Sequence, residues 1–318
     1  METSIQKEAT LYSDIFLSID FEKIIDHPNI LIAANFWETE RYEAAKTCYK
    51  FMRAIDDLID NYKTEHITIT KEKRKDLEKD VRNWINTILN TSEINPLQKE
   101  LNETITKFSI PLWPLEAFAT SMIYDIYNDG FPTLEDYLEY AKGASVAPAS
   151  IFVHLCGMTK ENGQYIPPAF NVKQVASPCA VFSYLVHIIR DFVKDHTHNL
   201  NYFPDDLLVK YHLDRKILLE MANGGEISPG FREMIRELYV VADEYRIKTL
   251  EVMQDIIPKL ETRNRLSLEI IFDLYLMVFE RINIDKGTFS TEELNPTVKE
   301  IKERVWKVIE SFKPDKYN

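Results

Sequence analysis

Charged and apolar residues alternate at helical spacing along most of the chain, which predicts an almost entirely helical protein. The pattern places long helices at about 35–61, 71–89 and 172–195. A polar stretch at 62–70 and a stretch with two prolines at 159–171 are expected to be loops. Since only 8 glycines interrupt the pattern, we expect few turns.

Local signals indicate several helix ends. Thr133, with Asp136 three residues later, forms a variant of the capping box. Ser228 followed by Pro229 fits the N-cap and first position of a long helix. Gly143 lies among small residues, and we expect a helix break there, where the backbone approaches another segment closely.

The chain has no repeat, low-complexity segment or long linker, so we expect a single domain over residues 1–318. An apolar fraction of 45% is sufficient for a large core. These features predict an all-α fold, a single helical bundle.

The net charge limits the classes of partner. With 38 basic and 51 acidic residues, the formal charge is −13. Nucleic-acid binding through phosphate contacts requires basic faces, so nucleic acid is not an expected partner. Simple attraction to anionic lipid is disfavoured for the same reason. A phosphate ligand would have to be held through bound cations or in a local basic pocket.

Three cysteines, Cys48, Cys156 and Cys179, are widely spaced among apolar residues and are expected to be buried, reduced thiols. The N-terminal residues lack the basic and apolar regions of a secretory signal. No continuous run reaches the roughly 18 apolar residues that span a bilayer. We therefore expect a cytoplasmic protein.

Two aspartate pairs are the strongest chemical signal. Asp56 and Asp60 form the first pair, and Asp191 and Asp195 form the second. In each pair the residues are four apart, so on a helix both carboxylates share one face. One such pair is usually a solvated surface feature, but both pairs have apolar flanking residues, and buried charges are costly unless they bind something.

Carboxylate pairs of this kind suit Mg²⁺, which takes one or two protein carboxylates and completes its shell with water and phosphate oxygens. Arg53 and Arg190 lie just before the two pairs and could donate bidentate hydrogen bonds to a phosphate. Two such faces across a bundle would hold a diphosphate and assist its departure from an allylic carbon. An apolar pocket would then keep the cation from water.

These motifs resemble those of the squalene/phytoene synthase family. The resemblance rests on four segments in order: Arg53-x-x-Asp56-Asp57-x-x-Asp60, Ser121-Met122-x-x-Asp125 with Leu134 to Tyr137 and Gly143, Ile188-Ile-Arg190-Asp191-x-x-x-Asp195, and Asn201-Tyr202-Phe203-Pro204. It implies an isoprenoid synthase fold around a central cavity. It also implies Mg²⁺ on the four paired aspartates, diphosphate contacts from Arg53 and Arg190, and Tyr49, Tyr202 and Tyr275 near the substrate.

Further candidates for substrate binding each have a simpler alternative. His187 contacts diphosphate or orients an aspartate, or it is a core histidine bonded to backbone. His27 and Asn29 lie where the family's N-terminal segment approaches phosphate, or they only form a turn. Lys142 contacts phosphate, or it is a surface side chain. The family commonly carries Gln and Asn where this chain has Tyr184 and His187.

The implied reaction is the head-to-head condensation of two farnesyl or geranylgeranyl diphosphates, through a cyclopropylcarbinyl diphosphate, to a squalene- or phytoene-type hydrocarbon. NADPH would be needed if the product is squalene. A terpene cyclase acting on one prenyl diphosphate is the alternative enzyme, and a non-enzymatic helical assembly factor is a third hypothesis. The sequence leaves open the oligomeric state and transient membrane contact during product release.

Overall fold

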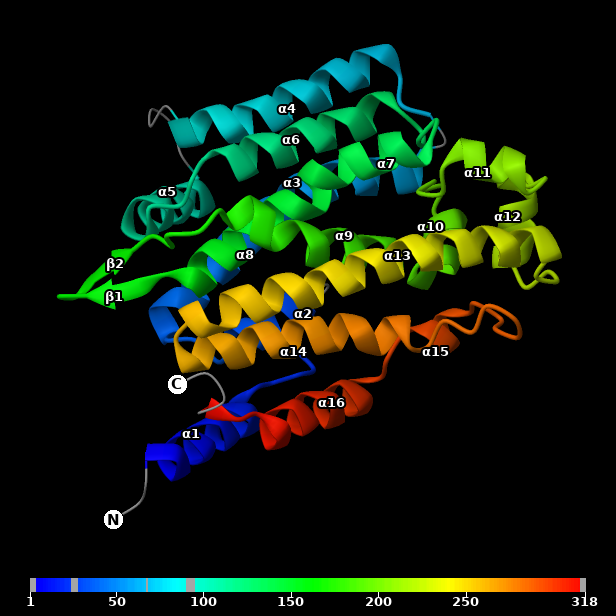
Figure 1. Ribbon diagram of the computed structural model, residues 1–318. Coiled ribbons are helices and arrows are strands. Elements are labelled where there is room, and N and C mark those ends of the chain that lie inside the picture. The colour runs from blue at the N-terminus through cyan, green and yellow to red at the C-terminus, as the bar shows by residue number, and fades with distance from the viewer. Residues whose placement is uncertain (1–3, 24–27, 67, 90–94, 315–318) are drawn as a thin grey trace.

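The computed structural model describes residues 4–23, 28–66, 68–89 and 95–314, which form a helical bundle with one short hairpin (Figure 1). The elements in chain order are α1 (Ser4–Ser18), α2 (Pro28–Ala34), α3 (Thr39–Glu65), α4 (Lys71–Leu89), α5 (Pro96–Phe108), α6 (Trp113–Tyr127), α7 (Leu134–Ala141), the π-helical turn η1 (Lys142–Val146), α8 (Ala147–Gly157), β1 (Thr159–Glu161), β2 (Gln164–Ile166), α9 (Val172–Arg190), α10 (Phe192–Thr197), α11 (Asp205–Lys210), α12 (Arg215–Ala222), α13 (Pro229–Ile256), the 3₁₀ turn η2 (Ile257–Lys259), α14 (Thr262–Phe279), α15 (Thr291–Leu294) and α16 (Val298–Ser311). The prediction of an all-α fold is confirmed.

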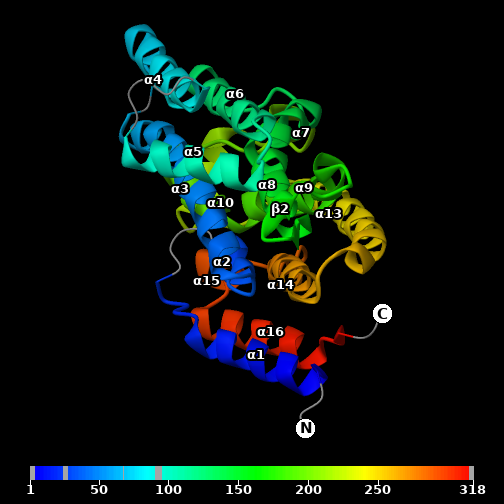
Figure 2. The ribbon, with the colours of Figure 1, turned by 90° about the vertical axis from the view of Figure 1, so that its left-hand side faces the viewer.

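The helices are arranged in layers around α9. Helix α9 packs against α8, α13 and α14, and α3 packs against α5, α6 and α8. Helices α4 and α6 lie together at one edge of the molecule, whereas α1 and α16 form a pair at the opposite edge, beneath α14 (Figure 2). The two ends of the described chain are therefore adjacent.

Several predicted helix ends are confirmed. Helix α4 has the predicted bounds, whereas α3 begins and ends four residues later than expected. The Thr133 hydroxyl accepts a hydrogen bond from the Asp136 amide at 3.1 Å, and the Asp136 carboxylate accepts one from the Thr133 amide. The Ser228 hydroxyl likewise accepts from the Phe231 amide at 3.2 Å.

The predicted break at Gly143 is wrong. The chain continues from α7 through the π-helical turn into α8 without leaving the helix. The predicted close approach is present, however: a Cβ on Gly143 would lie 2.1 Å from the Ser121 hydroxyl oxygen and 2.4 Å from the Ala117 carbonyl oxygen of α6. The small residue serves a tight helix crossing rather than a turn.

Two local features differ from the predicted pattern. The helix expected over 172–195 is interrupted at Asp191, where φ is −91° and ψ is 10°, so the second aspartate pair spans the end of α9 and the start of α10. The expected loop at 159–171 contains the antiparallel hairpin of β1 and β2. Its turn is Asn162-Gly163, and both residues have positive φ.

The burial of the cysteines and of the most apolar helix can be compared with the predictions. All three cysteines are free; Cys48 and Cys156 are buried and Cys179 is partly buried, as predicted. Within the described residues one helix, α9, is long and apolar enough to cross a membrane by length and composition. It packs against α8 and α13 inside the bundle.

Candidate active site

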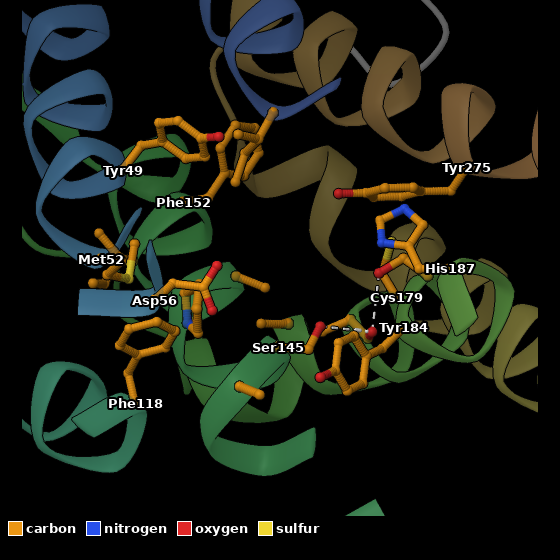
Figure 3. A pocket seen from close by; sticks show the side chains of 18 of the residues that line it. Tyr49, Met52, Asp56, Phe118, Ser145, Phe152, Cys179, Tyr184, His187 and Tyr275 are labelled. Atoms are coloured by element: carbon orange, nitrogen blue, oxygen red, sulfur yellow. Dashed lines mark hydrogen bonds between the residues drawn. The ribbon is translucent and has the colours of Figure 1, made fainter. Parts of the chain in front are cut away.

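A cavity of about 520 Å³ lies between α3, α8, α9, α13 and α14. Its walls are mostly apolar and aromatic, and a group of polar side chains gathers on the α9 side (Figure 3). The apolar walls include Met52, Phe118, Ile151, Phe152, Met253 and Ile271. A volume of this size is suited to a ligand of small-molecule dimensions.

All four paired aspartates line this one cavity. Asp56 and Asp60 lie in the C-terminal half of α3, and their side chains reach the cavity from the same helix face. Asp191 and Asp195 reach it from the junction of α9 and α10. The structure thus brings together two motifs that are far apart in the sequence.

The electrostatics show that these carboxylates are crowded. Burial raises the pKa of Asp56 well above its usual value, and the neighbouring Asp60 raises it further. Burial also raises the pKa of Asp60. The pKa of Asp195 is raised by burial, then by Asp191, and in part by Asp60 across the cavity. Neighbouring negative charges in a buried site favour the binding of a cation.

The donor set fits a cation that relies on few protein ligands. Among the described residues, no group of three or more His, Cys, Asp or Glu side chains is close enough to enclose a metal ion. Mg²⁺ does not need such a group, because it keeps several waters and uses phosphate oxygens beside one or two carboxylates. The two aspartate pairs therefore fit Mg²⁺ that arrives with a phosphate ligand.

The two arginines of the motifs hold their aspartates in different ways. Arg53 lines the cavity, and its guanidinium lies 3.2 Å from the Asp56 carboxylate and 2.7 Å from that of Asp57. Arg190 donates to both oxygens of Asp191, at 2.8 and 2.6 Å. Arg190 is not among the cavity-lining residues, so its observed role is to orient Asp191.

The other predicted aromatic and imidazole residues reach the cavity. Tyr49, Tyr202, His187 and Tyr275 all line it. The rings of His187 and Tyr275 lie 5.5 Å apart, edge to face (Figure 3). His187 thus faces the cavity from the turn of α9 that precedes Asp191.

Two predicted substrate contacts, Lys142 and Asn29, are not brought to the cavity. The Lys142 side chain is exposed and forms an ion pair with Glu139. Asn29 is half-buried in α2 and is not among the cavity-lining residues, although its neighbour Ile30 is. His27 lies outside the described residues. We leave Lys142 and Asn29 out of the proposed site.

The structure also shows a polar cluster beside the first aspartate pair, around Asp125, whose contacts were not predicted although Asp125 belongs to one of the motifs that resemble the family. Asp125 on α6 is buried, and its carboxylate accepts a hydrogen bond from the Tyr140 hydroxyl at 2.5 Å. Lys63 on α3 lies 3.9 Å from the same carboxylate. A charged residue at a core position of an apolar helix was the available signal.

The sequence matches the family described as squalene/phytoene synthase over residues 28–299. A search of curated proteins found no match.

Three of the solved structures that share this fold are the following. A dehydrosqualene synthase in complex with a ligand is 16% identical, with a TM-score of 0.66 and coverage of 95% of this chain and 99% of that one. The squalene synthase HpnC from Alicyclobacillus acidocaldarius is 13% identical, with a TM-score of 0.62 and coverage of 88% and 94%. YisP from Bacillus subtilis subsp. subtilis strain 168 is 14% identical, with a TM-score of 0.60 and coverage of 96% and 99%.

At these identities the structural matches show a shared fold, the isoprenoid synthase fold that the motifs led us to expect. The family match covers most of the chain and includes both aspartate motifs. The chain therefore belongs to the squalene/phytoene synthase family.

Proposed function

We propose that this prenyltransferase condenses two C15 or C20 isoprenyl diphosphates head to head and depends on Mg²⁺. The main support is that both aspartate pairs line a single cavity whose remaining walls are largely apolar. One end of the cavity suits a diphosphate with its cations, and the rest suits an isoprenyl chain. Membership of the family supports the same class of reaction.

The ionising end is formed by residues of α3, α9 and α10. Asp56, Asp60, Asp191 and Asp195 would hold Mg²⁺, which when bound neutralises the charge that develops on a departing diphosphate. Arg53 faces the cavity and is placed to donate to phosphate oxygens. Arg190 fixes the orientation of the Asp191 carboxylate.

The apolar walls protect the allylic cation that ionisation leaves. Met52 and Phe118 lie close to Asp56, and Phe152 lies against the wall next to Tyr49 (Figure 3). Aromatic faces stabilise nearby positive charge, and exclusion of water prevents capture of the cation as an alcohol. The reaction would join C1 of one substrate to the C2–C3 double bond of the other.

One observation favours a second function, the terpene cyclase that takes a single diphosphate. Among the described residues that line the cavity, the side chains with a permanent positive charge are Arg53 and Lys194. Two diphosphates carry more negative charge than these groups and the expected cations readily balance. A requirement for NADPH, contact with a membrane and a cytoplasmic location stay predictions.

The test is to incubate the purified protein with Mg²⁺ and either farnesyl or geranylgeranyl diphosphate, with and without NADPH, and to identify the products by mass spectrometry. A C30 or C40 hydrocarbon, or a cyclopropylcarbinyl diphosphate, supports condensation. A C15 or C20 hydrocarbon or alcohol supports the one-substrate function. Turnover of neither substrate contradicts both.

A matched pair of variants links turnover to the proposed site. Asp60→Asn removes one carboxylate of the cavity pair. Asp80→Asn removes one carboxylate from Asp76 and Asp80, which are also four residues apart but lie on the exposed face of α4. We expect Asp60→Asn to lower turnover by more than about 100-fold, beyond the usual effect of losing an outer partner of a metal site, and Asp80→Asn to have no effect.

A further inference from the structure

A histidine follows the second aspartate pair at the opening of the cavity. His198 lies three residues after Asp195, and both residues line the cavity. Asp195 is buried, whereas His198 is exposed. The carboxylate thus lies inside the cavity, and the imidazole lies where the cavity meets solvent.

The hydrogen bonds of His198 determine which ring nitrogen is available to a ligand. Its Nδ1 lies 2.7 Å from the Lys194 carbonyl oxygen, which can only accept, so Nδ1 carries the hydrogen. In the neutral imidazole Nε2 is then unprotonated, which is the form that binds a metal ion. A histidine that ligates a metal almost always donates its other ring N–H to a carboxylate, a carbonyl or water, and His198 has this arrangement.

His196 makes the same kind of hydrogen bond in a different environment. Its Nδ1 lies 2.9 Å from the Phe192 carbonyl oxygen. Its ring is buried, with its centroid 5.1 Å from that of Phe192 and 5.4 Å from that of Phe203, and it is not among the cavity-lining residues. The hydrogen bond alone therefore does not mark a ligand; of these two histidines, His198 combines it with a place on the cavity wall.

One closed turn of the backbone carries both Asp195 and His198. The His198 amide donates to the Asp195 carbonyl at 3.1 Å, and the Leu200 amide donates to the same oxygen at 2.8 Å. Asn199, between them, has a φ of 58°, the left-handed conformation that turns the chain back. A backbone that is already ordered lowers the entropy lost when both side chains bind one ion.

The two sides of the cavity therefore offer different donor atoms. On α3 the ionisable candidates are Asp56, Asp57 and Asp60, which supply oxygen and suit Mg²⁺. On α10 the imidazole nitrogen of His198 is added to the carboxylate of Asp195. Imidazole favours first-row transition-metal ions over Mg²⁺, so the α10 side differs from the α3 side in the ion that it prefers.

We propose that Asp195 and His198 bind a divalent first-row transition-metal ion, such as Mn²⁺ or Co²⁺, that enters the cavity with a diphosphate. This inference rests on the proposed diphosphate site and refines the identity of the ion on the α10 side, where Mg²⁺ would bind more weakly. It does not depend on whether one or two substrates react.

The proposed ion needs the diphosphate as a further ligand. Asp195 and His198 are two protein ligands, and water and phosphate oxygens would complete the coordination shell. This agrees with the lack of a three-residue metal group among the described residues. The Lys194 ammonium also lines the cavity and would repel a bare cation, so we expect little binding of the metal without diphosphate.

The direct test is pulsed electron paramagnetic resonance of Mn²⁺ bound to the purified protein with inorganic diphosphate. An imidazole ligand adds a modulation from its nitrogen nucleus to the Mn²⁺ signal, which oxygen ligands do not produce. We expect this modulation in the wild type and its loss in His198→Asn. A wild-type spectrum without the nitrogen modulation overturns the inference.

Isothermal titration calorimetry with the Mn²⁺ and the Mg²⁺ complexes of diphosphate measures the metal preference. We expect His198→Asn to raise the Kd of the Mn²⁺ complex at least about tenfold, the smallest usual effect of losing a partner of a metal site. The Kd of the Mg²⁺ complex should change little, because Mg²⁺ prefers oxygen ligands. Equal losses for the two metals would mean that His198 contacts the diphosphate instead of the ion, and the inference would be wrong.

The matched control is His212→Asn. His212 is exposed, is not among the cavity-lining residues and has a φ of 56°, a conformation that asparagine tolerates. We expect this variant to keep the nitrogen modulation and both Kd values. His187→Asn tests a second histidine that lines the cavity. Loss of the modulation there, with retention in His198→Asn, would place the nitrogen ligand on α9 and overturn the assignment of His198.

The outcomes separate this inference from the proposed function. If neither metal–diphosphate complex binds the wild type, the proposed diphosphate site fails, and the proposed function fails with it. If both complexes bind and bound Mn²⁺ has no nitrogen ligand, the inference alone is overturned.

Discussion

Gly143 and Ser121 fix the distance between η1 and α6. The Ser121 hydroxyl donates to the Tyr140 carbonyl at 3.0 Å, and it occupies the space that a Cβ on residue 143 would need. The Ala117 carbonyl closes the same space from the next turn of α6. Helix α6, which carries Asp125, and the turn η1, which directly follows Tyr140 and Ala141, are thus held in contact at a position where any Cβ would require α6 to shift.

We expect Gly143→Ala to destabilise the protein by about 1–3 kcal/mol, the usual cost of overpacking a close helix contact. Urea unfolding would measure the loss. Adding Ser121→Gly should restore only part of it, because the Ala117 carbonyl would still lie 2.4 Å from the new Cβ. An unchanged midpoint in Gly143→Ala would show that α6 can move away freely.

Binding of Mg²⁺ should depend on a phosphate ligand. Because the described residues do not form a ready three-residue metal group, Mg²⁺ alone should raise the melting temperature little. Mg²⁺ with inorganic diphosphate should stabilise the protein by about 2.7 kcal/mol at a hundredfold excess over Kd. Differential scanning calorimetry with and without diphosphate tests this, and equal shifts in both conditions would contradict it.

Asp56→Asn should separate stability from activity. Burial and Asp60 raise the folded-state pKa of Asp56 above its unfolded value, so at neutral pH the ionised carboxylate opposes folding of the metal-free protein. The amide removes that charge, and we expect turnover to be lost while the free energy of unfolding stays equal or rises by about 1 kcal/mol. The gain should shrink as pH falls towards the usual carboxyl pKa. Urea unfolding of both proteins in the presence of a chelator measures this difference. A free energy of unfolding that is lower in the variant by more than about 1 kcal/mol would contradict the prediction.

His154 should make stability depend on pH. Its Nε2 lies 2.9 Å from the Phe108 carbonyl, and burial lowers the pKa of the imidazole below its unfolded value. The unfolded chain therefore binds more protons as pH falls below about 6.5, and the stability contributed by the neutral side chain is lost in that range.

The comparison variant is His154→Gln, whose amide can still donate to the carbonyl but does not titrate. The difference in unfolding free energy between wild type and variant should be constant above about pH 7.5. Below about pH 6.5 the wild type should lose stability relative to the variant. A difference that stays constant down to pH 5 would mean that the histidine remains equally protonated in both states.

Patterns within one element were predicted well from sequence. The charged helix α4 has the expected bounds, and the Thr133 and Ser228 caps form as expected, because each depends on nearby residues. The meeting of the two aspartate motifs in one cavity was also predicted, since two acidic faces with apolar flanks had few other ways to be accommodated.

Features that depend on contacts between distant elements were not predicted. The hydrogen bond between Asp125 and Tyr140 exists only because α6 packs beside α7 and η1. The interruption at Asp191 has no proline or glycine to signal it. The hairpin, in contrast, has a local signal. Asn162-Gly163 is a recognised hairpin-turn sequence, although only a loop was predicted there.

The π-helical turn has a consequence for the length of the chain. A π turn accommodates one residue more than the α-helix would at the same place. Deleting one residue within Lys142–Val146 would therefore let α7 and α8 merge into a regular helix with α8 in nearly the same orientation. Ile151 and Phe152 would then still face the cavity. A deletion within α8 itself, in contrast, would rotate the residues after it by about 100°, the angle per residue in an α-helix. The turn thus absorbs one residue without changing which side of α8 forms the cavity wall.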